Sequence, residues 1–107
     1  MRLVIKSGAD GLWWTLMSSA DDSRPLARGV GPCRDVEGCR AAASMLGGAP
    51  LHKSASRVDD QRWRWQVADA DGTVVAESAV TFDSAAESGY ALYELRHELA
   101  RSPLAAH

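Results

Sequence analysis

The chain has 107 residues and a net charge of −2 at pH 7, and 46% of its residues are hydrophobic and 24% charged. That length predicts one domain with its own core, and the composition is typical of a soluble globular protein. The slightly negative charge argues against a dedicated nucleic-acid binder, which is usually basic, and no apolar run approaches the roughly 20 residues of a membrane helix.

The first half of the chain predicts three strands followed by a helix. The predicted elements are strands over 3–5, 12–17 and 25–28 and a helix over 36–46. A polar turn over 18–24 separates the second strand from the third. Asp35 is a candidate N-cap of the helix, and Gly47-Gly48 is expected to end it because glycine readily adopts the left-handed conformation. Residues 47–50 are interpreted as a linker.

The second half repeats this order more clearly. Its predicted elements are strands over 51–58, 63–67 and 73–76 and a helix over 85–100. Trp63 and Trp65 alternate with arginines, which places the two aromatic residues on one face of a strand. The run over 69–72 ends in Asp-Gly, which favours a tight hairpin. Ser84 and Glu87 match a capping box at the start of the second helix.

The two halves predict an internal duplication. Trp14 and Trp65 lie 51 positions apart, and the same order of elements surrounds each. A period near fifty residues is typical of a duplicated supersecondary unit. The sequence therefore predicts an α+β protein made of two tandem β-β-β-α repeats, over 1–48 and 51–102, which together form one domain. We expect one antiparallel sheet with both helices on one face and pseudo-twofold symmetry.

The second repeat carries a recognisable pattern. It reads Trp63-x-Trp65-x-Val67, then Gly72-x-Val74-Val75-Ala76-x-Ser78, then Glu87-x-Gly89-Tyr90-x-x-Tyr93. This pattern resembles the YegP-like family, small bacterial proteins of unknown function built from tandem repeats. The resemblance covers nearly the whole chain, but the first repeat departs from it, and its helix aligns either through Gly38-Cys39 or one position later. It implies two β-β-β-α units that share one sheet with strand exchange, and it implies no activity.

Few residues are candidates for catalysis or metal binding. His97 follows Glu94 by three positions, and this pair is interpreted as part of a solvated helix face. No HxxxH or HExxH spacing supports a zinc site. Cys33 and Cys39 are expected to be reduced thiols, with Cys39 packed as a small hydrophobic residue. The sequence predicts a protein that is not an enzyme and has no cofactor or metal, and the absence of a signal-like apolar run predicts a cytoplasmic location.

The tryptophans point to a candidate binding surface. Three of them are expected in the core beneath the helices: Trp14, Trp63 and Trp65. Trp13 alternates with Trp14 and should therefore lie on the uncovered face of the sheet. The candidate binding residues on that face are Trp13, Thr15, Met17, Arg62 and Arg64. Trp13 either contributes to an interaction surface or packs against the turn over 18–24.

Three functions are compatible with this reading. The leading one is a small non-enzymatic interaction or structural module that binds a second copy or another protein through the uncovered sheet face. The first alternative is a nucleic-acid-binding accessory protein, because bases stack on aromatic side chains and arginine follows phosphates. It would use Trp13 with Arg57, Arg62 and Arg64, although nearby aspartates oppose it. The second alternative is a small-ligand binder at the seam between the repeats.

Overall fold

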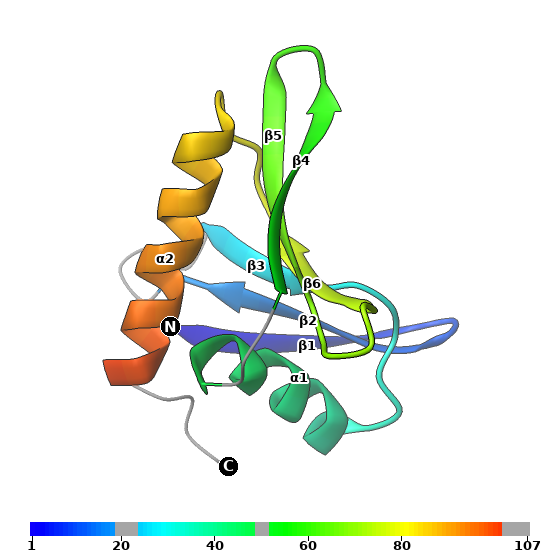
Figure 1. The fold of residues 1–107 in the computed structure, drawn as a ribbon. Coiled ribbons are helices and arrows are strands. Elements are labelled where there is room, and N and C mark those ends of the chain that lie inside the picture. The colour runs from blue at the N-terminus through cyan, green and yellow to red at the C-terminus, as the bar shows by residue number, and fades with distance from the viewer. Residues whose placement is uncertain (19–23, 49–51, 102–107) are drawn as a thin grey trace.

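The computed structural model describes residues 1–18, 24–48 and 52–101. Its elements in chain order are β1 (Arg2–Gly8), β2 (Gly11–Met17), β3 (Pro25–Gly29), α1 (Val36–Gly48), β4 (His52–Asp59), β5 (Arg62–Ala68), β6 (Val74–Ser78) and α2 (Ala85–Arg101). They form one six-stranded antiparallel sheet with two helices (Figure 1). The predicted α+β class is confirmed. No helix in the described ranges is long and apolar enough to cross a membrane.

The order of the strands brings distant parts of the chain together at the centre of the sheet. The order is β1-β2-β3-β6-β5-β4, so β3 and β6 are the middle pair and β1 and β4 are the edges. Each hairpin pairs neighbours in sequence, whereas the β3–β6 pair joins residues about fifty positions apart: Ala27 with Ser78, Arg28 with Glu77, and Gly29 with Ala76. The hydrogen-bonded side chains on the sheet face opposite the helices centre on this pair.

Local sequence signals account for the turn between β5 and β6. The carboxylate of Asp69 accepts hydrogen bonds from the backbone N–H groups of Asp71 (3.0 Å) and Thr73 (3.1 Å). Gly72 has a φ of 84°, a left-handed conformation that favours glycine. The predicted turn over 69–72 is confirmed. Of the predicted turn over 18–24, residues 19–23 lie outside the described residues, and Ser18 donates its N–H to the carbonyl of Arg24 over 3.0 Å.

Both helices begin at the predicted caps. Asp35 Oδ1 accepts the N–H of Gly38 (2.7 Å), and Ser84 Oγ accepts the N–H of Glu87 (3.1 Å). The reciprocal bond of the second cap reaches one residue further back than expected, because Glu87 accepts the N–H of Asp83 over 3.3 Å. These bonds satisfy N–H groups that have no partner within a helix.

The predicted end of the first helix is wrong, because α1 continues through Gly47 and Gly48. A Cβ at Gly47 would lie 3.0 Å from the Cβ of Leu99 on α2. Close packing between the two helices therefore favours glycine there, and tertiary contact overrides its low helix propensity. The remainder of the predicted linker, residues 49–50, lies outside the described residues.

One hydrophobic core joins the helices to a single face of the sheet. Its strand members are Trp14, Leu16, Ala27, Trp65, Val67 and Ala76, and its helix members are Cys39, Ala43, Leu46, Leu92, Leu95 and Leu99. Along β2 and β5 the buried members alternate with less buried positions such as Trp13, Thr15, Arg64 and Gln66, as expected for a sheet covered on one side. Burying side chains of this size contributes roughly 1.5–3 kcal/mol each before entropy is counted. The core therefore fixes which sheet face stays open.

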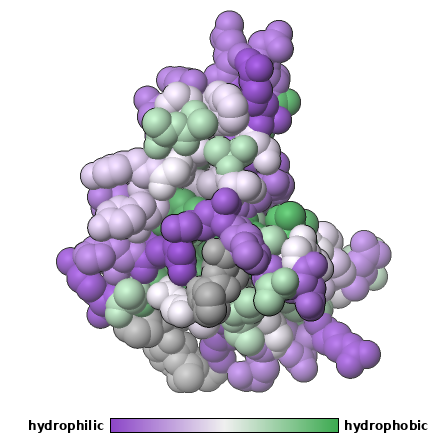
Figure 2. Space-filling view, in the orientation of Figure 1, coloured by the Kyte–Doolittle hydropathy of each residue, from purple (hydrophilic) through white to green (hydrophobic). Residues whose placement is uncertain are grey.

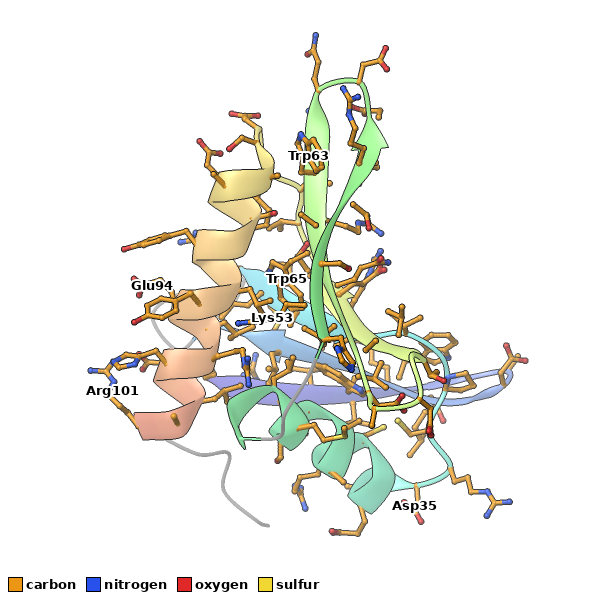
Figure 3. The ribbon with its side chains drawn as sticks, in the orientation of Figure 1. Asp35, Lys53, Trp63, Trp65, Glu94 and Arg101 are labelled. Atoms are coloured by element: carbon orange, nitrogen blue, oxygen red, sulfur yellow. The ribbon has the colours of Figure 1, made fainter. Side chains whose placement is uncertain are left out.

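The expectation that Trp63 lies in the core is wrong. It is half-buried and does not belong to the core cluster, unlike Trp65, which is 2% exposed. Trp63 lies further along the β4–β5 hairpin, beside the first turn of α2 (Figure 3). The guanidinium of Arg57 covers its ring at 5.5 Å from the centroid, a cation–π contact that replaces part of the missing helix packing. Hydrophilic side chains cover the projecting tip of this hairpin (Figure 2).

Candidate binding surface on the open sheet face

The face of the sheet opposite the helices carries the candidate residues of β2. Trp14 and Leu16 are buried at 2% and 0% exposure, and the residues that alternate with them point away. Trp13 is 38% exposed, while Thr15 and Met17 are half-buried. The structure thus places all three β2 candidates on the predicted face.

The indole of Trp13 is positioned by Gly8 on β1. A Cβ built at Gly8 would lie 2.8 Å from Nε1 and 2.9 Å from Cδ1 of Trp13. The pyrrole edge of the ring therefore rests against bare backbone at the end of the β1–β2 hairpin, and the residue as a whole is 38% exposed. The alternative that Trp13 packs against the turn over 18–24 falls mainly on residues 19–23, which lie outside the described residues.

A row of side chains crosses the open face from edge to edge. The strand registers place its members opposite one another in the order Val4, Thr15, Arg28, Glu77, Gln66 and Ser54. Directly opposed residues share a face and lie close enough for their side chains to interact. The row is polar or charged from β2 to β4, so this face of the central strands is not a second hydrophobic core.

Glu77 is the centre of a hydrogen-bonded network in this row. Its Oε2 accepts from Arg28 Nε at 2.7 Å and from Arg64 Nη1 at 3.0 Å. Its Oε1 accepts from the amide of Gln66 at 3.4 Å, and Gln66 accepts in turn from the hydroxyl of Ser56 at 3.0 Å. The Glu77 side chain is only 12% exposed, whereas Arg28 is 46% exposed. The carboxylate is therefore shielded by its partners, and Arg28 remains accessible at the rim.

The charges around Glu77 set its protonation. Burial alone would raise the pKa of Glu77, but the hydrogen bond from Arg28, the charge of Arg64 and the amide of Gln66 outweigh it, so the pKa lies below its ordinary value of 4.5. Glu77 is ionised at neutral pH. Two guanidinium groups against one carboxylate leave the network with one surplus positive charge.

One donor atom of Arg64 is left unpaired within the network. Its side chain is 24% exposed, and its Nε is buried without a hydrogen-bond partner in the described part of the chain. A buried donor left unpaired costs roughly 1–3 kcal/mol. The ion pair with Glu77 therefore offsets part of that cost.

The predicted arginine cluster is divided between the two faces of the sheet. Arg57 lies directly opposite Trp63 and stacks on it, so it is on the helix side. Arg62 donates to Thr81 Oγ1 over 3.1 Å, and Arg64 lies on the open face with Glu77. The expectation of one Arg57, Arg62 and Arg64 cluster is wrong, because the pairing register of β4 with β5 fixes the face of Arg57.

A hollow of about 400 Å³ opens on this face beside the β3–β6 junction. It is lined by Trp13, Trp14, Thr15, Arg28, Val30 and Glu77, together with Gly29 and Gly31. We call it the open-face hollow. Sequence reasoning missed Arg28, Val30 and Glu77. Alternation within 25–28 and 73–76 could have placed Arg28 and Glu77 opposite the core, but nothing local indicates that the two strands meet.

A second hollow lies on the helix side and is less informative. It has a volume of about 490 Å³ and is lined by Met1, Leu26, Ala91 and Leu95, together with the polar residues Ser18, Arg24, Glu94 and Glu98. Ser18 and Arg24 flank residues 19–23, which lie outside the described ranges. None of the residues that line the open-face hollow borders such a segment, so it is the better candidate.

The thiols form no metal site in the described ranges, where no group of three or more metal-ligating side chains occurs. Cys33 is half-buried and Cys39 buried, and both are free. Burial, together with a hydrogen bond to Cys33 and the charges of Cys33 and Asp35, raises the pKa of Cys39 to about 12. Cys39 is therefore a protonated core residue, not a nucleophile.

The outer face of α2, expected to be a solvated helix face, carries an aromatic stack. His97 stacks on Tyr93 with ring centroids 6.2 Å apart and planes 9° apart. A hydrogen bond to Glu94 raises the pKa of Tyr90. Tyr90 and Tyr93 are 66% and 64% exposed. Glu94 also lines the hollow of about 490 Å³ on the helix side. Tyr90 and Tyr93 point outward, and we treat them and His97 as solvated helix surface.

None of the family models, curated proteins and solved structures compared with the chain matches it. The proposed function therefore rests on the geometry of the site.

Proposed function

We propose that the protein is a small non-enzymatic binding module that uses the open face of its sheet. One observation carries this proposal: the 38% exposed indole of Trp13 borders a hollow whose other wall is the partly exposed Arg28. Exposed aromatic and arginine side chains in one concave site are characteristic of binding surfaces. The partner is a second copy of the chain or another protein, as inferred from the sequence.

We also propose that the chain is a tandem repeat of the YegP-like kind with a pseudo-twofold relationship between its units. Equivalent pairs support this. Leu16 pairs with Ala27 as Val67 pairs with Ala76, and the isolated bridge of Leu12 with Cys33 corresponds to that of Trp63 with Phe82. The paired positions differ by 51 residues in the second strand of each unit and by 49 in the following segment, because the first unit has two extra residues in its turn.

The nucleic-acid alternative is less well supported by the geometry. Arg57 is on the opposite face from Trp13, and Arg28 and Arg64 share the carboxylate of Glu77. Single-strand binding grooves need several unpaired cations along the backbone path. Arg28, Arg64 and Glu77 leave only one surplus positive charge among them, which is less than such a path needs.

A small-ligand function at the seam has one specific observation in its favour. The open-face hollow adjoins Arg28 and Glu77, which are the paired residues of β3 and β6. A volume of about 400 Å³ lies within the range of roughly 300–1,000 Å³ for ligand sites. This candidate uses the same face as the leading proposal.

Paired variants test the use of the open face. Trp13→Ala and Arg64→Ala should each weaken self-association in sedimentation velocity, or capture of a partner by the immobilised protein. Tyr93→Ala removes a more exposed aromatic residue, at 64% against 38% for Trp13, from α2 and should change neither. If both open-face variants assemble and capture as the wild type does, the proposal is wrong.

A further inference from the structure

We propose that the open-face hollow binds a small planar monocarboxylate, with its ring against Trp13 and its charge at Arg28. This inference rests on the proposed function, because it assigns a ligand class to the same face.

The apolar side of the hollow fits a flat ring. Trp13 and Val30 are 38% and 42% exposed, and both line the hollow. Val30 continues the open-face positions of β3, and its N–H donates to the carbonyl of Val75 over 3.2 Å, which fixes its backbone. Gly8 fixes the edge of the indole. Two fixed apolar groups on one concavity favour a rigid planar group, since offset stacking on an indole stabilises an aromatic ring.

The polar side of the hollow fits a carboxylate. Nε and Nη2 of Arg28 both contact the carboxylate of Glu77. Nη1 of Arg28 has no hydrogen-bond partner in the described part of the chain. Thr15, opposite Arg28 in the ladder, adds a hydroxyl to the same wall. A guanidinium donates to carboxylates with strong charge-assisted hydrogen bonds.

The net charge around the open-face hollow favours a ligand with one negative charge. Arg28, Arg64 and Glu77 together carry one surplus positive charge, and Glu77 itself lines the hollow. A dianion such as inorganic phosphate would place its second charge near an ionised carboxylate, which repels it. A monocarboxylate balances the surplus.

The experiment uses 1-naphthoate as the probe, titrated into wild-type protein and followed in ¹H–¹⁵N spectra. The indole N–H signal of Trp13 is assigned as the one absent from Trp13→Phe. We expect saturable shifts of that signal and of the backbone amides of Thr15, Arg28 and Val30, at probe concentrations on the order of millimolar. The neutral 1-naphthamide should bind at least about tenfold more weakly than 1-naphthoate. Inorganic phosphate should shift none of these signals.

Matched variants separate the two contributions. Arg28→Gln should weaken 1-naphthoate about tenfold and leave 1-naphthamide unchanged, whereas Trp13→Ala should weaken both. Arg101→Gln and Tyr93→Ala remove an exposed arginine and an exposed tyrosine from α2 and should change neither affinity. Should Arg28→Gln fail to fold, the comparison of the two probes on wild-type protein still decides.

Equal affinity for the two naphthyl probes, or shifts that avoid Trp13, would overturn this inference. The two proposals fail separately. If 1-naphthoate leaves Trp13 unaffected while Trp13→Ala weakens assembly or capture, the ligand class is wrong and the binding face stands. If neither probe nor variant has an effect, both proposals fall.

Discussion

Arg28 on β3 and Glu77 on β6 face each other across the middle of the sheet, and Arg28 Nε donates to Glu77 Oε2 over 2.7 Å. The two residues are 49 positions apart in sequence. Their pairing ties the two halves of the chain together on the face that the helices leave open. Arg64 and Gln66 reach the same carboxylate from β5, so Glu77 holds three strands in register.

Glu77→Gln should lower the free energy of unfolding by about 1–3 kcal/mol, because it weakens charge-assisted bonds and leaves the partly buried Arg64 without its counter-charge. Urea unfolding followed by circular dichroism measures the change. Glu98→Gln is the control: it removes an exposed ion pair with Arg101 and should cost less than about 0.5 kcal/mol. Equal effects of the two variants would show that the network adds no stability.

The contribution of Glu77 should depend on pH with a defined sign. Because its pKa is lowered in the folded protein, the unfolded chain takes up the proton more readily. The stabilisation is therefore complete above the ordinary pKa of 4.5 and is lost as the pH falls through the lower folded value. Unfolding measured between neutral and acidic pH should show the wild type converging on Glu77→Gln below that point. A difference that grows as the pH falls would contradict the sign.

Two glycine substitutions should act in opposite directions. A Cβ at Gly29 would overlap the indole of Trp14, which is 2% exposed and has no room to move. Gly29→Ala should therefore destabilise by about 1–3 kcal/mol. A Cβ at Gly89 on α2 meets nothing within 4 Å, and Gly89→Ala should stabilise by about 0.5–1 kcal/mol. Thermal unfolding of both variants checks the pair.

Substitution of a tryptophan should cost more stability on the covered face of the sheet than on the open face. Trp65→Ala removes a 2% exposed core indole and should cost about 3–5 kcal/mol. Trp13→Ala removes a 38% exposed indole that lies outside the core cluster and should cost about 1 kcal/mol or less. Chemical denaturation distinguishes them. A large loss in Trp13→Ala would show that the residue serves the fold and would remove the basis for a binding role.

Cys39 should resist thiol reagents in the folded protein. It is fully buried, and its pKa is raised to about 12, so almost no thiolate exists at pH 8. With Cys33→Ser, Ellman's reagent at that pH should react only after denaturant is added. Rapid reaction without denaturant would mean that the site opens readily.

Several features followed from sequence because they depend on neighbours along the chain. The Asp69–Gly72 turn, the caps at Asp35 and Ser84, and the opposite faces of Trp13 and Trp14 are each decided within a few residues by backbone hydrogen bonding and strand alternation. The same reasoning failed at the end of α1, which continues through Gly48; at Gly47, packing against Leu99 outweighs helix propensity.

The candidate site depended on contacts that no local pattern encodes. Side-chain alternation along a strand places Arg57 and Arg64 each on one face of the sheet. Only the register of β4 with β5 decides that these two faces are opposite. Arg28 and Glu77 meet because β3 and β6 pair at the centre of the sheet, a contact over 49 positions. The sequence alone determined the elements and their buried sides, because alternation and capping are short-range. Only the tertiary structure decided which charges converge beside Trp13, because strand order and register are set by packing between distant segments.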